Sequence, residues 1–140
     1  MECKTRELTI SLMPNNVIVS EFNNNITELS IEGVEETLEV LREFNTINER
    51  PKGGVAEMPS FYVNKKIIKM YTTTDVLIPV ALGLVANSFA SKLVGNLFLT
   101  LRARFGSSTQ DYPIRVLSTK KEAIEWVKGH IESATTVTSF

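Results

Sequence analysis

One long apolar run, from Val76 to Leu101, dominates the hydrophobic pattern of this chain. Lys92 is its only charged residue, so the run is either a membrane span or the buried centre of a fold. Pro79 and the pair Asn87-Ser88 interrupt it, and Lys92 would lie deep in hydrocarbon if the run were one membrane helix. The run therefore predicts a buried strand over residues 76–86, followed by a helix that begins at one residue of that polar pair.

The first residues of the chain predict a β-hairpin. Leu8, Ile10 and Leu12 alternate with polar residues, and a second alternating stretch covers residues 17–21. Residues 14–16, Pro-Asn-Asn, have the turn-forming composition that is expected between two paired strands. The chain thus begins with two antiparallel strands joined by a tight turn.

Residues 30–71 predict a helix, a short strand and a second helix. Ser30 has the side chain of a helix N-cap, and the glutamates after it suit the positive end of the helix dipole. The spacing predicts that this helix buries five apolar residues: Ile31, Val34, Leu38, Leu41 and Phe44. After a loop at 50–54, residues 55–58 predict a strand, and Ser60 is expected to cap a helix over residues 61–71.

Strand and helix alternate again towards the C-terminus. The helix that begins at 87–88 places Phe89, Leu93, Leu97 and Leu101 at four-residue steps, and the stripe of Phe89, Leu93, Leu97 and Phe98 is expected to lie mostly in the core. A polar, mobile loop at 102–110 and a strand at 113–117 follow, and the capping box of Thr119 and Glu122 opens a last helix. The Ser/Thr-rich residues 133–140 are expected to form a disordered tail.

These elements follow one another as β-β-α-β-α-β-α-β-α over one domain, residues 1–132. Strands that alternate with helices predict a largely parallel sheet with right-handed crossovers, whereas the first two strands pair antiparallel. The fold class is therefore α/β, with a mixed sheet of about five strands, an N-terminal hairpin and about four helices. At 140 residues the chain is long enough for one such core.

Composition and charge narrow the classes of partner. The chain has 15 Lys and Arg against 16 Asp and Glu, and this balance gives no reason to expect nucleic acid or an anionic membrane as partner. Cys3 is the only cysteine, which excludes a disulfide within the chain. We see no secretory signal and interpret no segment as transmembrane, so a cytoplasmic location is expected.

No catalytic or metal-binding motif stands out. His130 is the sole histidine, and without a second histidine or a cysteine cluster a metal or acid–base role is not expected. No activating base accompanies Cys3, and Gly53-Gly54 precedes a strand, whereas a dinucleotide-binding loop follows one. We therefore expect no catalytic residue, no metal and no cofactor, and an enzyme is the weakest functional hypothesis.

Three short motifs carry a resemblance to a known family. They are Arg50-Pro51 before a strand, Gly95-Asn96-Leu97-Phe98 within a helix, and the stretch Leu117–Trp126 at the start of the last helix. In this order they resemble the STAS, or SpoIIAA-like, superfamily, and most closely its small stand-alone bacterial proteins of unknown function. The resemblance covers residues 8–131. It implies a STAS-like fold and a bacterial, cytoplasmic protein with a regulatory or protein-binding role.

The resemblance also draws attention to Ser60. In phosphorylatable STAS antagonists a serine within a D-S-S/T-G motif caps the helix after the third strand, and the surface around it meets a partner. Here residues 57–62 read Glu-Met-Pro-Ser-Phe-Tyr, which lacks the adjacent acid, the second hydroxyl and the glycine of that motif. Ser60, Phe61 and Lys65 are the candidate phosphorylation or partner site, and the alternative for Ser60 is a plain helix N-cap.

The helix expected after residue 88 is apolar on more than one side, so part of it is a candidate interface or ligand surface. The candidate residues are Phe89, Lys92, Leu93, Asn96, Leu97, Phe98 and Arg102. The leading hypothesis is a non-enzymatic interaction module that docks an unknown protein partner, or a second copy of itself as a homodimer, through residues 88–110. The alternative is a carrier of a small apolar, lipid-like ligand, which requires a cavity with few polar groups beneath residues 76–98.

Overall fold

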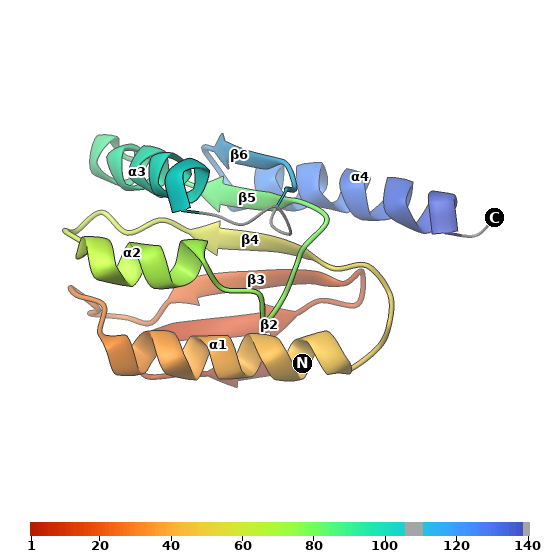
Figure 1. The fold of residues 1–140 in the computed structure, drawn as a ribbon, viewed down its shortest axis with the longest axis horizontal. Coiled ribbons are helices and arrows are strands. Elements are labelled where there is room, and N and C mark those ends of the chain that lie inside the picture. The colour runs from red at the N-terminus through yellow and green to blue at the C-terminus, as the bar shows by residue number, and fades with distance from the viewer. Residues whose placement is uncertain (106–110, 139–140) are drawn as a thin grey trace.

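The structure is a computed structural model, and it describes residues 1–105 and 111–138 of the chain. Within these residues, strands and helices follow one another as drawn in Figure 1. Their bounds are β1 (Glu2–Lys4), β2 (Leu8–Leu12), β3 (Val17–Phe22), α1 (Ile31–Thr46), β4 (Gly53–Glu57), α2 (Lys65–Thr72), β5 (Leu82–Val85), α3 (Phe89–Phe105), β6 (Ile114–Leu117) and α4 (Lys120–Thr138). The protein is therefore an α/β protein, as its sequence predicts.

The strands form one mixed sheet whose order in space is the order along the chain. β1, β2 and β3 pair antiparallel, and β3 to β6 pair parallel. At the centre of the sheet Val19 of β3 lies opposite Val55 of β4, which in turn lies opposite Gly83 of β5. The sheet has six strands, one more than expected. The extra strand is β1, which is too short to show an alternating pattern in the sequence.

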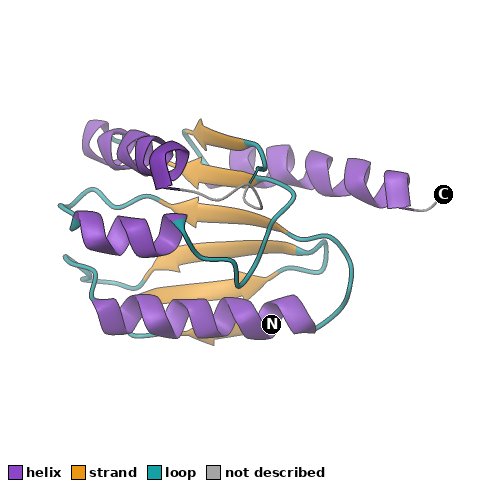
Figure 2. Cartoon of the chain, viewed as in Figure 1, coloured by secondary structure: helices purple, strands orange, loops and turns teal. Residues whose placement is uncertain are grey.

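Helices cover the two faces of the sheet unequally. Parallel strands that are added in one direction, with crossovers of the usual hand, place their crossover helices on one face. Accordingly α1, α2 and α3 lie in front of the sheet in Figure 2, and α4 lies behind it. Three helices thus share one face, and a single helix covers the other.

The face under α4 is packed as one continuous cluster. Val17 and Val55 of the sheet are buried together with Val127 and Ile131 of α4. Gly53 allows α4 to come this close, because a Cβ atom at that position would collide with the side chain of Val127. Close backbone approach therefore fills the part of this face that lies directly under α4, whereas a second pocket lies beside it, between the ends of β3 to β5 and the start of α4.

The face under α1, α2 and α3 holds two separate clusters. One cluster joins β2 and β3 to α1 and contains Ile10 and Phe44, both almost fully buried. The other joins the three helices and contains Ile67 of α2 and Leu101 of α3. The space between these two clusters is the candidate site described below.

The cap of α1 is as predicted, but the helix buries a different set of residues. The Ser30 side chain accepts a hydrogen bond from the Gly33 N–H at 3.0 Å. Ile31, which was expected in the core, is exposed, whereas Thr37 and Val40 are buried. The stripe that faces the sheet therefore includes a hydroxyl among its apolar side chains.

The strand predicted over residues 76–86 is wrong in its first half. Only Leu82–Val85 form β5, and residues 76–80 have no strand pairing. Pro79 lacks an N–H for a ladder hydrogen bond, which accounts for the late start of the strand. In Figure 1 the chain between α2 and β5 instead dips across the sheet towards β2 and α1.

The predicted start of α2 is also wrong, because Asn64 rather than Ser60 caps the helix. The Asn64 side chain accepts a hydrogen bond from the Lys66 N–H at 2.7 Å. Phe61 lies outside the helix and packs edge-on against Phe22, with 5.6 Å between ring centroids. Asn64 stands directly before the helical run and caps it, whereas Ser60 lies four residues earlier, outside the helix.

The C-terminal elements agree with the sequence except at the tail. The Thr119 hydroxyl accepts from the Glu122 N–H at 3.1 Å, as a capping box requires. α4 continues to Thr138 through most of the stretch that was expected to be disordered, and residues 139–140 lie outside the described residues. α3 likewise takes in residues 102–105 of the expected loop, whose residues 106–110 are not described. Among the described helices, none combines the length and apolar character needed to cross a membrane.

Candidate functional site

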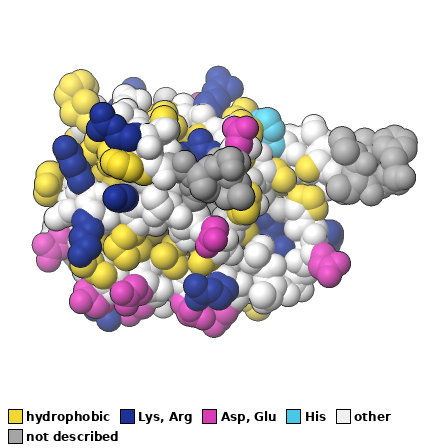
Figure 3. Space-filling model, viewed as in Figure 1, with side chains coloured by type: hydrophobic (Ala, Val, Ile, Leu, Met, Phe, Trp, Pro, Cys, Tyr) yellow, Lys and Arg dark blue, Asp and Glu magenta, His cyan; other side chains and the backbone are white. Residues whose placement is uncertain are grey.

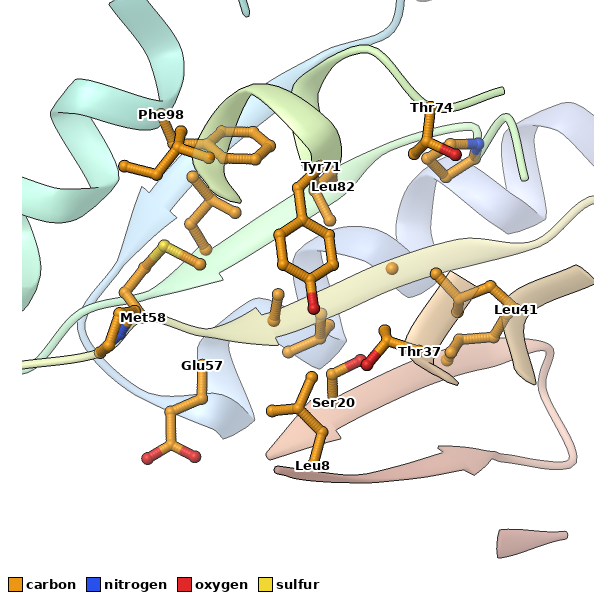
Figure 4. Close-up of a pocket in the computed structure, with 18 of the residues that line it drawn as sticks. Leu8, Ser20, Thr37, Leu41, Glu57, Met58, Tyr71, Thr74, Leu82 and Phe98 are labelled. Carbon is orange, nitrogen blue, oxygen red and sulfur yellow. The ribbon is translucent and has the colours of Figure 1, made fainter. Parts of the chain in front are cut away.

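A cavity of about 170 Å³ lies between the sheet and the three helices on its front face. It occupies the space between the two core clusters of that face. Strands, helices and the chain before β5 all contribute to its wall, as Figure 4 shows in part. Its apolar wall includes Leu8, Ile18, Leu41, Met58, Leu84 and Phe98.

Small residues in the central strands explain why the cavity is there. Ser20 of β3 and Gly54 and Ala56 of β4 line it where larger side chains would otherwise fill the core. The chain before β5 closes the opposite side with Val76 and Pro79. The same local features that shorten β5 therefore build one wall of the cavity.

Two hydroxyl groups reach the cavity without a hydrogen-bond partner among the described residues. They are Oγ1 of Thr37, a side chain that is 2% exposed, and the phenol oxygen of Tyr71. In Figure 4 Tyr71 reaches from α2 towards Ser20 and Thr37. An unpaired buried polar group costs about 1–3 kcal/mol of stability, so two at one place need an explanation.

The electrostatics around Tyr71 favour its neutral form. Burial raises the pKa of the Tyr71 phenol to about 12, and the carboxylate of Glu7 acts in the same direction. The Thr37 hydroxyl lies close enough to the Tyr71 phenol to lower its pKa by a hydrogen-bonding interaction, but the pair falls short of full hydrogen-bond geometry. Tyr71 is therefore protonated at neutral pH, and its hydroxyl can both donate and accept a hydrogen bond.

Two carboxylates border the site. Glu7 is buried beside α1, and its Oε2 accepts hydrogen bonds of 2.7 Å from both the backbone N–H and the hydroxyl of Ser30. Glu57 is exposed at the rim, and its Oε2 accepts from the Phe22 N–H at 2.9 Å. None of the described lining residues is Lys, Arg or His. Glu57 is thus the one charged side chain among the described residues that line the cavity.

The expected ligand surface on α3 is divided by the structure into inner and outer residues. Phe98 lines the cavity, and Leu97 packs in the cluster between helices. Arg102 lies with its guanidinium carbon 4.4 Å from the ring centroid of Tyr112, a residue that also lines the cavity. The Arg102 Nη2 donates to the Tyr112 carbonyl at 3.3 Å. These three residues belong to the inner side of α3.

The other four expected residues form an outer ridge on α3, made of Phe89, Lys92, Leu93 and Asn96. Phe89 is 80% exposed and Leu93 is 55% exposed, so their expected place in the core is wrong. Leu101 of the same repeat is buried, together with Ser91 and Gly95, because the helix lies at the edge of the helical layer and turns the ridge to solvent. Figure 3 shows basic side chains gathered over α2 and α3 and acidic ones along α1.

The residues around Ser60 do not form a phosphorylation motif at a helix start. Ser60 is exposed and lies in a bend, Phe61 is half-buried against Phe22, and Lys65 is exposed at the first turn of α2. Helix α2 is capped by Asn64, so the arrangement implied by the family resemblance is absent at Ser60. Its phosphorylation stays a prediction.

The remaining candidates lie apart from the cavity. The His130 ring packs edge-on against Trp126, with 4.7 Å between ring centroids. Cys3 is half-buried in β1, opposite Ile10. The described residues contain no group of three or more side chains that could hold a metal ion.

Sequence reasoning did not single out Thr37, Tyr71 or Glu7. A signal was present for Thr37, because the helical period places it on the same stripe as Val34 and Phe44. Nothing in the sequence pattern indicates that Tyr71 points to the same place, since it stands near the end of another helix. Glu7 precedes a strand, and nothing in the sequence pattern indicates that it belongs to the site.

Comparison with known proteins does not place the chain in a family: no family model, curated protein or solved structure matches it. The resemblance to the STAS superfamily therefore stays a prediction. The case for function has to come from the cavity and the surface.

Proposed function

We propose that this protein is a non-enzymatic binding protein for a small apolar ligand, which lies in the cavity between the sheet and α1, α2 and α3. The observation that carries the proposal is a cavity of about 170 Å³ with an almost entirely apolar wall. An apolar cavity of about 150 Å³ is large enough to bind benzene. The ligand, or the part of it that enters, is therefore about the size of one aromatic ring or a short acyl chain.

Binding without catalysis is the simpler interpretation of the groups in the cavity. The polar side chains that reach it are mainly hydroxyls, with one carboxylate, Glu57, at the rim. Among the described lining residues no hydroxyl stands beside a histidine or lysine that would activate it as a nucleophile. A carrier or ligand-sensing role needs no such pair.

The STAS-like fold belongs to the same proposal. Support comes from the order of elements after β1, which is the order on which the resemblance rests. A short strand after Arg50-Pro51 and a helix containing Gly95–Phe98 stand where the resemblance expects them. The bacterial source, the cytoplasmic location and a regulatory role remain predictions from the same resemblance.

Two measurements test ligand binding. Native mass spectrometry of the purified protein is expected to show a bound small molecule that is released on denaturation. A titration with toluene, followed by methyl NMR, is expected to shift the Leu8 and Leu84 methyl groups saturably, because both line the cavity. The Val127 methyl groups serve as the internal control, since they lie on the opposite face of the sheet. Shifts of equal size at all three residues would argue against the site.

A matched pair of variants links binding to the cavity. Ala56→Leu adds three carbons at the cavity wall and is expected to weaken toluene binding about tenfold or more, because it occupies the space that the ring needs. Ala103→Leu makes the same change at an exposed position of α3 and is expected to leave binding unchanged. Equal affinity of the two variants for toluene would contradict the proposal.

A second candidate function, docking through the outer ridge of α3, is favoured by the exposure of Phe89 and Leu93. We infer that the partner is a second copy of this chain, because the charges of one copy complement those of another. Between Met58 and Phe105 there are six Lys and Arg residues and a single acidic residue, Asp75. The exposed side of α1 is acidic, through Glu32, Glu35, Glu39 and Glu43.

Sedimentation velocity tests the homodimer. The expected result is a concentration-dependent dimer that weakens with added salt, because complementary charges are screened. The double variant Phe89→Ser/Leu93→Ser is expected to be monomeric, whereas Ile47→Ser, at an exposed apolar residue after α1, is expected to behave as the parent protein. A monomer at all concentrations would reject this candidate.

A further inference from the structure

We propose that the ligand is uncharged and carries one hydrogen-bonding group, which lies between the Tyr71 phenol and the Thr37 hydroxyl. This inference rests on the proposed function and names the chemical class of the ligand that the same cavity takes. It assigns roles to two side chains that no motif of the sequence marks.

The first observation is the pair of unpartnered hydroxyls. Thr37 Oγ1 and the Tyr71 oxygen are both buried, both line the cavity, and neither has a hydrogen-bond partner among the described residues. They come from α1 and α2, so the helices bring them together from distant parts of the chain. Each hydroxyl can both donate and accept. A ligand oxygen or nitrogen between them would satisfy both groups.

The second observation concerns charge. No Lys, Arg or His is among the described residues that line the cavity, so an anionic ligand would be buried without a counter-ion. Glu57 stands at the rim, and the carboxylate of Glu7 acts on Tyr71 from behind the wall. These carboxylates oppose an anion, and Arg102, which contacts the lining residue Tyr112, does not itself line the cavity. A cation would have to leave water for a cavity whose only acidic lining residue is the exposed Glu57.

Three probes of similar size test the class of ligand. Phenol has one hydroxyl, toluene has a methyl group in its place, and benzoate carries a negative charge. In methyl NMR titrations near neutral pH, phenol is expected to bind about tenfold more tightly than toluene, as one added hydrogen bond to a buried site allows. Benzoate is expected to cause no saturable shift at the cavity methyl groups.

Two near-isosteric variants test the residues. Tyr71→Phe and Thr37→Val are each expected to reduce the affinity for phenol towards that for toluene, while the affinity for toluene stays the same. Neither variant is expected to lower the melting temperature, because the hydroxyl that it removes has no partner in the folded protein. Tyr62→Phe is the control, since this tyrosine is 83% exposed and lies outside the cavity.

The outcomes separate this inference from the proposed function. If toluene and phenol bind equally well in the parent protein, the cavity is an apolar site and the inference is wrong, while the proposed function stands. Tighter binding of benzoate, or a phenol preference that survives Tyr71→Phe and Thr37→Val, would also overturn it. If none of the three probes shifts the Leu8 and Leu84 methyl groups, the inference and the proposed function fail together.

Discussion

The two faces of the central sheet are built from the same strands but are packed in opposite ways. Behind the sheet a single helix, α4, lies so close that Gly53 has no room for a side chain. In front of it three helices share the surface, and the small residues Gly54 and Ala56 lie beside a cavity. Gly53 and Gly54 are neighbours in β4 and point to opposite faces.

The difference shows that a small residue in a strand does not by itself predict either close packing or a cavity. Beneath one helix that runs across several strands, a missing side chain is replaced by the helix itself. Beneath three helices that share one face, the volume beside Gly54 and Ala56 stays open. In this protein, small residues of the same strand thus give close packing under one helix and border a cavity under three.

The largest effect is expected for Gly53→Ala. Its added methyl group collides with Val127, so α4 or β4 has to shift, and the free energy of unfolding is expected to fall by about 1–3 kcal/mol. Gly53 does not have a positive φ, so the effect is steric and not conformational. Urea denaturation measures it. Gly54→Ala is the matched control on the cavity face, because the nearest atom there is the flexible end of Leu82. If Gly54→Ala lowers the free energy of unfolding as much as Gly53→Ala does, the comparison between the two faces is wrong.

A smaller effect is expected from the ionisation of Tyr71 on the cavity face. Because burial raises the pKa of this phenol to about 12, the folded protein holds the proton more tightly than the unfolded chain, whose phenol titrates near 10. This contribution to stability is complete below pH 10 and is lost as the pH rises from 10 to 12. The parent protein is expected to lose about 1 kcal/mol more than Tyr71→Phe between pH 9 and pH 11.

Urea denaturation of both proteins across this pH range measures the difference, and other titrating groups cancel because the two chains share them. Parallel pH profiles for the parent protein and Tyr71→Phe would mean that the phenol is hydrated, and the front face would then be less closed than the structure indicates.

The smallest effect is expected for Gly129→Ala on the outer side of α4. Apart from its chain neighbours and the backbone of its own helix, no heavy atom lies within 4 Å of a Cβ built at this position, so the substitution is expected to raise the free energy of unfolding by about 0.5–1 kcal/mol. This gain in stability would show that α4 tolerates a side chain on the side that faces away from the sheet. A loss of stability would mean that α4 is packed on both sides, contrary to the comparison of the two faces.

Much of the fold could be predicted from the sequence because its signals are local. The alternation from Leu8 to Leu12 and the helix caps at Ser30 and Thr119 each act within a few residues and are confirmed. The errors arise where contacts between residues distant in sequence determine which side chains are buried. Phe89 and Leu93 repeat at a helical period that suits a core stripe, yet the place of α3 at the edge of its layer exposes them.

The site could be predicted only in part. The carrier hypothesis requires a cavity beneath residues 76–98, and Val76, Leu84 and Phe98 do line one. Thr37 and Tyr71 come close together because of how α1 and α2 pack against each other. The hydrophobic periodicity of neither helix predicts that packing. Whether a volume is left unfilled depends on how the whole molecule packs.

The agreement between strand order and chain order has a consequence for the protein while it is being made. Each new parallel strand can add to an edge that already exists, so the sheet can grow as the chain leaves the ribosome, without waiting for a later strand to be inserted. The back of that sheet, with Val17 and Val55, is covered by α4, which is the last element to be synthesised. At roughly 5 to 20 residues per second, several seconds pass between the completion of β4 and the arrival of its cover. During that time the sheet face that α4 buries in the finished molecule is bare and apolar, and a chain that stops before Lys120 never covers it.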